Sequence, residues 1–305
     1  MQQSGFPPGG FAPGSSTQSY QRRWAADMPG CLILLLDQSK SMDEQMGAGV
    51  IGAGQRKADA ASMVVNNVLK EVVKRCTQGS AVRPRVDLAL VGYGPGQTVH
   101  NALGGMLGNQ DMVSVADLAM NPLRINHTVI KEFDPETGSM IQVPMDVPIW
   151  VEPVADNGTP MCAAMDAGYY LAYNWVMNHP DNFPPIIVNI TDGASTDGDP
   201  RPNAARFGQL ATNDGATLLF NCHLSSTGGY QVRYPADPSQ VPHDPDGLAA
   251  MLFEISSPLP EQLRAFGNST YGMSLLPGAR GFVFGGDIMD LTQFITIASL
   301  PKTDR

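Results

Sequence analysis

The sequence lacks the features of a disulfide-rich secreted protein and of a membrane protein. Its 305 residues include only four cysteines, and none of them forms a Cys-x-x-Cys pair. We interpret Cys31, Cys76, Cys162 and Cys222 as buried thiols, because they fall inside predicted strands or helices. No apolar run reaches the roughly 18 residues of a membrane span, and the N-terminus shows no charged start followed by an apolar core. These absences predict a cytoplasmic protein.

Positive charge is also scarce. The chain has 19 Lys and Arg against 29 Asp and Glu, a formal net charge of −10, which disfavours nonspecific binding to nucleic acids or anionic membranes. The five histidines form no H-E-x-x-H pair, and the sequence has no G-x-S-x-G elbow and no phosphate-binding Gly-Lys-Ser/Thr loop. Hydrophobic residues, at 43%, are plentiful enough for a sizeable core, and the single succession of motifs favours one domain.

An apolar run over residues 31–36 ends abruptly in polar residues. The run CLILLL has no polar alternation, which predicts a strand covered on both faces in a parallel sheet. Asp37, Ser39 and Ser41 follow it at alternate positions and offer hard oxygen atoms, which suit Mg²⁺, Mn²⁺ or Ca²⁺ better than Zn²⁺. Taken alone, these three residues could equally cap the next helix.

Two later stretches favour a ligand site over a helix cap. NGTPM, residues 157–161, places Thr159 in a glycine-containing loop before a helix. PIIVNITDG, residues 185–193, repeats the first pattern, because a buried apolar strand ends in Asp192 and then Gly193. Open α/β sheets bind ligands at the carboxyl ends of their strands, and the residues 37–41 sit at such an end.

Asp-x-Ser-x-Ser, then a loop threonine, then a strand-terminal aspartate before glycine resembles the metal-ion-dependent adhesion site of the von Willebrand factor A (VWA) family. The resemblance implies that Ser39, Ser41 and Thr159 bind a divalent cation directly, while Asp37 and Asp192 hold it mostly through water. It also implies that an acidic side chain of a partner protein completes the coordination shell. The chemistry agrees, because a cation with few direct carboxylate ligands is left short of negative charge.

The rest of the chain predicts a doubly wound α/β fold with a mostly parallel sheet and helices on both faces. Strands and helices alternate, and residues 56–76 and 161–178 are expected to be helices. Residues 1–27 are rich in Gly, Pro and Ser and predict a disordered tail, which leaves 28–305 as the VWA-like domain. Within it, 97–156 is an insertion containing a β-hairpin that either extends the sheet edge or projects near the Thr159 loop.

We therefore expect a divalent-cation-dependent protein-binding module and no catalytic activity. Intracellular bacterial members of the VWA family are similar to this chain. They imply an adaptor or assembly role beside a AAA+ ATPase or a kinase and phosphatase pair in stress signalling. The alternative is a metal-dependent phosphohydrolase with Asp37 as nucleophile or Mg²⁺ ligand. Such phosphatases need a second aspartate two residues later, and here that position is Ser39.

Overall fold

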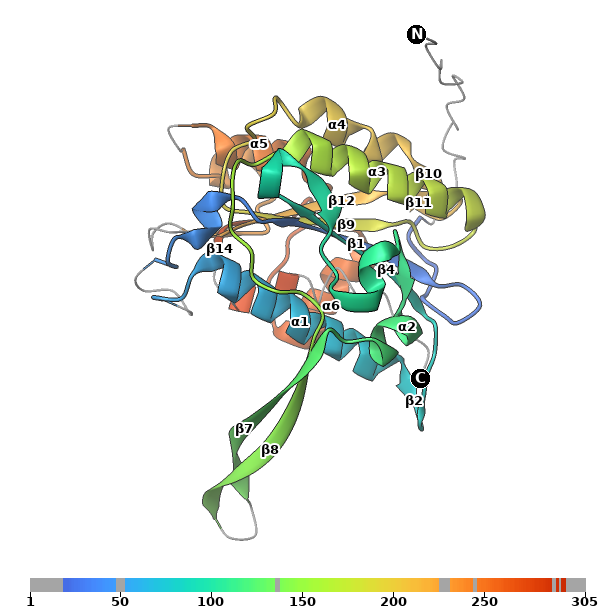
Figure 1. Ribbon diagram of the computed structural model, residues 1–305. Helices are drawn as coiled ribbons and strands as arrows, with labels where there is room; N and C mark the ends of the chain where they lie inside the picture. The colour runs from blue at the N-terminus through green and yellow to red at the C-terminus, as the bar shows by residue number, and fades with distance from the viewer. Residues whose placement is uncertain are drawn as a thin grey trace.

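The apolar runs of the sequence become the inner strands of a central sheet in the computed structural model, which has a mixed α/β fold (Figure 1). It describes residues 19–47, 53–134, 138–224, 231–243, 246–286, 289–290 and 292–294. Within these ranges eight strands form the sheet, in the order β13-β14-β12-β9-β1-β4-β5, with β6 also paired to β4. The parallel strands are β1 Gly30–Asp37, β4 Val86–Tyr93, β9 Ile186–Thr191, β12 Leu218–Leu224 and β14 Phe282–Gly286. The antiparallel strands are β5 Val99–Asn101, β6 Val113–Ser114 and β13 Val232–Arg233.

Strand β1 lies inside the sheet between β9 and β4, and all eight of its residues are buried. Successive side chains of a strand point to opposite faces, and β1 follows this rule. Leu32, Leu34 and Leu36 belong to one apolar cluster, whereas Ile33 and Leu35 belong to another on the opposite face. The continuous apolar run is therefore explained by burial on both sides, and the expected mostly parallel sheet is confirmed.

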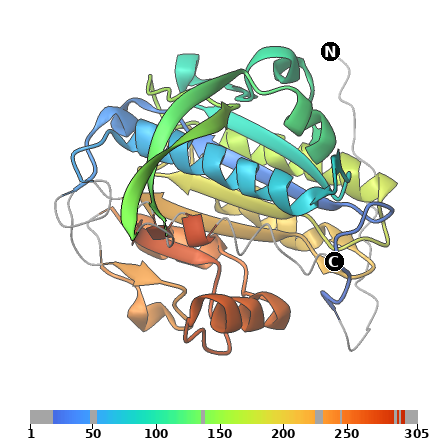
Figure 2. The same cartoon turned by 90° about the horizontal axis from the view of Figure 1, so that it is seen from below.

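Helices cover both faces of the sheet (Figures 1 and 2). On the first face lie α1 Lys57–Cys76, α2 Val115–Met120 and α6 Glu261–Tyr271. On the second face lie α3 Met161–Asn178, α4 Arg201–Ala205 and α5 Leu248–Ile255. Of the helices described, none has the length and apolar character needed to cross a bilayer.

Short elements complete the described chain. Two small ribbons pair β2 Thr77–Gln78 with β3 Ala81–Val82, and β10 Ala211–Thr212 with β11 Gly215–Ala216. The 3-10 helices are Lys40–Asp43, Pro95–Gln97, Gly105–Asn109, Phe207–Gln209 and Pro238–Gln240. The sequence also predicts a helix over residues 288–300, most of which falls outside the described residues.

The strand order reverses direction beside β1. From β1 the chain proceeds through α1 to β4 on one side, and it later reaches β9 on the other side. Neighbouring connections therefore leave the carboxyl ends of β1 and β9 in opposite directions. Such a reversal opens a crevice outside the strand ends, where ligands bind in open α/β sheets. The two strands whose ends carry the predicted acids, β1 and β9, are direct neighbours in the sheet.

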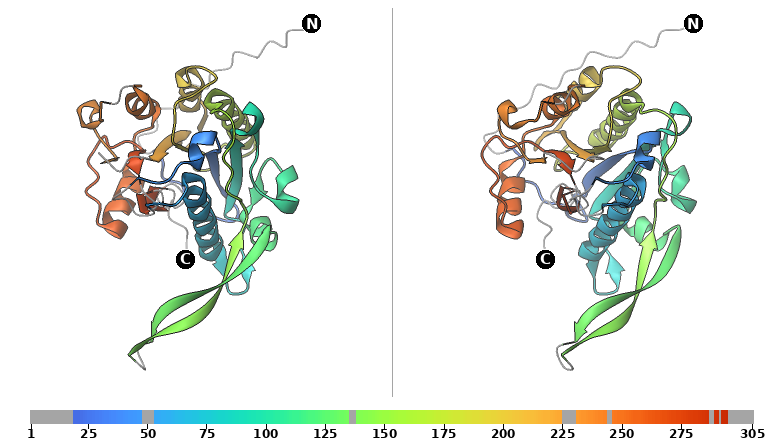
Figure 3. Two further views of the ribbon diagram at one scale, coloured as in Figure 1. Left: turned by 60° about the vertical axis from the view of Figure 1, so that its left-hand side comes forward. Right: turned by 90° about the vertical axis from the view of Figure 1, so that its left-hand side faces the viewer.

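The predicted hairpin is present in the insertion and forms a separate two-stranded sheet. Strands β7 Arg124–Asp134 and β8 Ser139–Ile149 pair antiparallel along their full lengths. They project away from the central sheet as an arm (Figures 1 and 3), so the hairpin does not extend the sheet edge. Its base is fixed by Trp150, which is buried and donates its indole N–H to the carbonyl of Leu118 at 2.7 Å.

The arm exposes several apolar side chains, among them Val129, Phe133 and Met140.

The two strands of the arm differ in their outer edges. Pro144 and Pro148 in β8 pair with Val129 and Ile125 of β7. Because proline has no N–H, it occurs in strands where its nitrogen faces a free edge. The outer edge of β8 therefore lacks two hydrogen-bond donors.

Part of the segment assigned by composition to a tail is packed against the domain. Residues 1–18 lie outside the described residues, but Trp24 is fully buried among the side chains that contact the first face of the sheet. Tyr20 donates its hydroxyl to the carbonyl of Ala216 at 3.2 Å, and the Gln21 N–H donates to the Asp214 carboxylate at 2.9 Å. The packed chain therefore begins before residue 28.

Candidate functional site

The candidate site begins where β1 ends. Asp37 is the last residue of β1 and is fully buried. Its Oδ1 accepts the backbone N–H of Ser39 at 2.9 Å, which turns the chain out of the strand. Its Oδ2 accepts the hydroxyl of Thr191, the last residue of β9, at 2.6 Å. Asp37 therefore fixes the loop that carries the two serines and ties that loop to the neighbouring strand.

The two serines connect this loop to Asp192. The hydroxyl oxygens of Ser39 and Ser41 lie 3.0 Å apart, and Ser41 donates to Asp192 Oδ1 at 2.7 Å. Asp192 follows β9 directly, and its side chain has 0% exposure. Because β1 and β9 are parallel neighbours, residues 151 positions apart in the sequence meet at one sheet edge.

Thr159 reaches the same place from the loop before α3. Its backbone N–H donates to Thr196 Oγ1 at 2.9 Å, and the Lys40 N–H donates to the Asn157 carbonyl at 2.9 Å, so this loop is bonded to both others. A Cβ atom built on Gly193 would lie 3.7 Å from Ser41 Oγ and 4.0 Å from Thr159 Oγ1. The absence of a side chain at Gly193 thus leaves room beside two hydroxyls that a Cβ atom would fill, and the structure brings all five predicted residues together.

Lys57 also belongs to this cluster, although the sequence analysis did not include it. Its Nζ donates to Asp192 Oδ2 at 2.7 Å and to Glu44 Oε2 at 3.1 Å. The Lys57 side chain is 1% exposed. A signal was present in the sequence, because helical spacing puts residue 57 on the same side of α1 as Ala61, Val64 and Val68, which are buried.

The donor set determines which cation could be held. Within the described ranges, no three His, Cys, Asp or Glu side chains come together as metal ligands. A cation in this cluster would therefore bind through the hydroxyls of Ser39, Ser41 and Thr159, with Asp37 and Asp192 beside them. Oxygen-only ligands suit Mg²⁺, Mn²⁺ or Ca²⁺. Gly193 leaves room beside two of the hydroxyls, and the pairing of Asp192 with the Lys57 ammonium shows that the carboxylates of this cluster attract positive charge.

Burial and a second acid perturb Asp37. Burial raises the pKa of Asp37 from 3.8 to about 6, and the negative charge of Asp192 adds to the increase. Hydrogen bonds from Ser39 and Thr191 act in the opposite direction. Removal from water penalises the charged form, so the folded protein favours the protonated acid more than a solvated carboxyl would. A nearby cation would favour the ionised form instead.

This shift predicts how the stability of the metal-stripped protein depends on pH. Because the folded pKa is raised, the Asp37 contribution is complete below about pH 4 and is lost as the pH rises through about 6. We expect the free energy of unfolding to fall by about 2 kcal/mol between about pH 4 and about pH 7 because of the ionisation of Asp37. Urea unfolding at about pH 4 and about pH 7 measures it. The Asp37→Asn variant should lack this component, and an equal pH dependence in both proteins would contradict the burial effect.

Asp197 lies close to these loops but has a structural partner. Its carboxylate accepts the backbone N–H groups of Cys162 at 3.0 Å and Ala163 at 2.9 Å, in the first turn of α3. It also accepts the Ser195 hydroxyl at 2.7 Å. Asp197 therefore caps the helix that follows Thr159, which supports the position of that loop.

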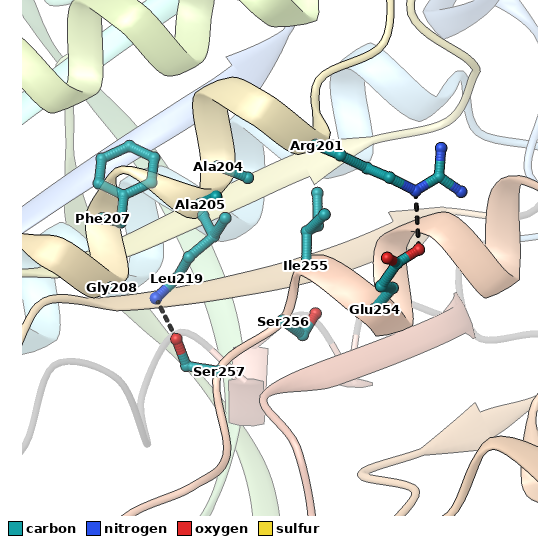
Figure 4. Close-up of a pocket in the computed structure, with 10 residues that line it drawn as sticks. All are labelled: Arg201, Ala204, Ala205, Phe207, Gly208, Leu219, Glu254, Ile255, Ser256 and Ser257. Carbon is teal, nitrogen blue, oxygen red and sulfur yellow. Dashed lines mark hydrogen bonds and ion pairs between the residues drawn. The ribbon is translucent and has the colours of Figure 1, made fainter.

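A shallow pocket of about 310 Å³ lies between α4 and α5 and does not include the candidate site residues (Figure 4). Arg201 and Glu254 form an ion pair at 2.7 Å on its wall, and the Leu219 N–H donates to Ser257 Oγ at 2.9 Å. These polar groups are paired with one another, so they are not directed into the pocket to receive a ligand. The pocket therefore presents no arrangement of reactive side chains comparable to the loops around Asp37.

Comparison with known proteins gives partial structural matches. No family model matches the chain, and no curated protein sequence is detectably similar to it. It is similar to the PilB minor pilin from Streptococcus sanguinis, with 13% identity and a TM-score of 0.30, over 57% of this chain and 31% of that chain. It is also similar to three N-terminal domains of the type V pili tip protein Mfa5 from Porphyromonas gingivalis, with 16% identity and a TM-score of 0.29 over 55% and 20%. The vWF domain of Mfa5 gives 17% identity and a TM-score of 0.30 over 55% and 39%. This chain thus spans less than half the length of each of these chains.

Proposed function

We propose that the chain is a VWA-type, doubly wound domain that binds a protein partner through a divalent cation. The observation that carries the proposal is the convergence of three loops. Ser41 and Thr159 place hydroxyl groups beside Gly193, and the Ser39 hydroxyl lies 3.0 Å from that of Ser41. Asp192 accepts the Ser41 hydroxyl, and Asp37 orients the serine loop. Their position at the carboxyl ends of β1 and β9, where the strand order reverses, is the expected ligand position in such a sheet.

The chemistry of this donor set favours binding over catalysis. Hydroxyl ligands are neutral, so a cation held by them keeps much of its positive charge and attracts a carboxylate from outside. A partner's Asp or Glu side chain would supply that carboxylate. The resemblance of the motif extends the proposal to an adaptor or assembly role, with a AAA+ ATPase or a kinase and phosphatase pair as the class of partner.

Calorimetric titration of the metal-stripped protein with Mg²⁺ and Mn²⁺ tests the proposal. We expect one cation to bind per chain. An affinity capture from the native host, run with and without a chelator, should then retain an acidic partner only when the cation is present. Failure of the parent protein to bind either ion, together with a capture that the chelator leaves unchanged, would contradict cation dependence.

A further inference from the structure

Lys57 is a charged residue at a position where the neighbouring turns of the helix carry apolar side chains. It is the first residue of α1, and its side chain is 1% exposed. Ala61 and Val64, one and two turns further along, are buried against the sheet. Removing an ammonium group from water is costly unless it is paired. The pairing partners of Lys57 should therefore indicate its role.

Those partners belong to the proposed cation site. The Asp192 carboxylate accepts Ser41 through Oδ1 at 2.7 Å and Lys57 through Oδ2 at 2.7 Å, so both of its oxygens are engaged. Glu44, which follows the serine loop, accepts Lys57 at 3.1 Å and is 59% exposed. Asp192, with 0% exposure, is thus the buried partner of Lys57 and also the neighbour of a proposed cation ligand.

We infer that Lys57 is a built-in counter-ion of this site, which shares Asp192 with the divalent cation and thereby lowers the affinity of the site for it. The inference rests on the proposed function. Two positive groups that share one buried carboxylate repel each other, and the repulsion is weakly screened away from water. Lys57 already supplies part of the positive charge that the acids of the site attract. Low intrinsic affinity makes retention of the cation depend on the extra carboxylate that a partner brings.

The experiment compares Mn²⁺ binding by the metal-stripped parent and a Lys57→Met variant, using calorimetry. Methionine keeps the length of the side chain and removes its charge. We expect the variant to bind Mn²⁺ at least about tenfold more tightly. The unpaired Asp192 should also destabilise the metal-free variant, so Mn²⁺ should raise its melting temperature more than that of the parent.

Three further variants separate the charge from the shape of the side chain. Lys57→Gln is a second neutral replacement, which keeps a hydrogen-bond donor near Asp192 and replaces Lys57→Met if that variant does not fold. Lys57→Arg keeps the charge and should retain the weaker binding of the parent. Lys74→Met removes an exposed charge at the other end of α1 and should leave the affinity unchanged.

The outcomes distinguish this inference from the proposed function. Unchanged or weaker Mn²⁺ binding by the neutral variants, with clear binding by the parent, would overturn the role of Lys57 and leave the cation site standing. Tightening in Lys57→Arg equal to that in Lys57→Met would also overturn it, because charge would not be the cause. No binding by the parent or by either neutral variant would overturn both. Binding by the neutral variants alone would support Lys57 as the group that blocks the cation.

Discussion

Replacement of Asp37 or Thr159 by alanine is expected to abolish cation binding and, with it, binding of the acidic partner. Asp37→Ala removes the carboxylate that orients the serine loop through Ser39 and joins it to Thr191. Thr159→Ala removes one proposed ligand and leaves the backbone bonds of its loop in place. Loss of an orienting group or ligand should weaken binding by about 100-fold or more. Calorimetric titration with Mg²⁺ measures the change.

Matched substitutions at residues outside the three site loops serve as controls for these two variants. Asp181→Ala removes an exposed carboxylate just before β9, at the opposite end of the strands, and Thr98→Ala removes an exposed hydroxyl after β4. Both should bind Mg²⁺ as the parent does. Circular dichroism should show that Asp37→Ala and Thr159→Ala keep the fold. Parent-like Mg²⁺ affinity in both site variants would show that the site does not hold a cation.

Trp24→Ala is expected to reduce the free energy of unfolding by about 3–5 kcal/mol, because it empties a large space in the core. The indole is fully buried and covers Gly30 at the start of β1. A Cβ atom on Gly30 would lie 2.0 Å from the Trp24 ring, so only glycine fits at position 30 while the indole is in place. Urea unfolding monitored by circular dichroism measures the loss.

Arg22→Ala is the matched control for Trp24. It lies two residues earlier, is exposed, and contributes its backbone N–H, which the substitution keeps, to the Asp214 carboxylate. We expect a change of less than about 0.5 kcal/mol. If Trp24→Ala changed the free energy of unfolding as little as Arg22→Ala does, the segment before residue 28 would not contribute to the core. That result would contradict the buried position of the indole.

The meeting of the five candidate residues was predictable because each one sits at the end of a recognisable element. The run before Asp37 and the run before Asp192 are uninterrupted apolar strands, and carboxyl ends of parallel strands meet at one sheet edge. Thr159 precedes a helix whose bounds, Met161–Asn178, agree with the sequence prediction. These features depend on local sequence, so the pattern alone indicates where the residues converge.

Lys57 shows where that kind of prediction ends. Helical spacing places it on the buried face of α1, so the sequence indicates that it needs a negative partner. The partner, Asp192, lies 135 residues later, and Glu44 lies in the loop before the helix. Which carboxylate receives the ammonium depends on where the first turn of α1 lies relative to the end of β9. That information is tertiary, and no local pattern contains it.

Other differences from the sequence prediction have similar physical causes. Helix α5, Leu248–Ile255, was not predicted, because a short apolar run without clear periodicity fits a strand as well as a helix. Averaged composition hid Trp24 within a segment rich in Gly and Pro. The hairpin was recognised as two strands joined by a turn, but its projection away from the central sheet depends on tertiary contacts such as the hydrogen bond from Trp150 to Leu118 at its base.

The unequal edges of the projecting hairpin limit how it could polymerise. Exposed strand edges are templates for pairing with strands of other chains. Pro144 and Pro148 withhold two backbone donors from the outer edge of β8, whereas β7, Arg124–Asp134, contains no proline. A strand of another chain would therefore pair with the outer edge of β7, where no proline interrupts the backbone donors. A second copy that added there through its own β7 would close a symmetric four-stranded pair with a proline-bearing β8 on each outside, so growth would stop at two chains.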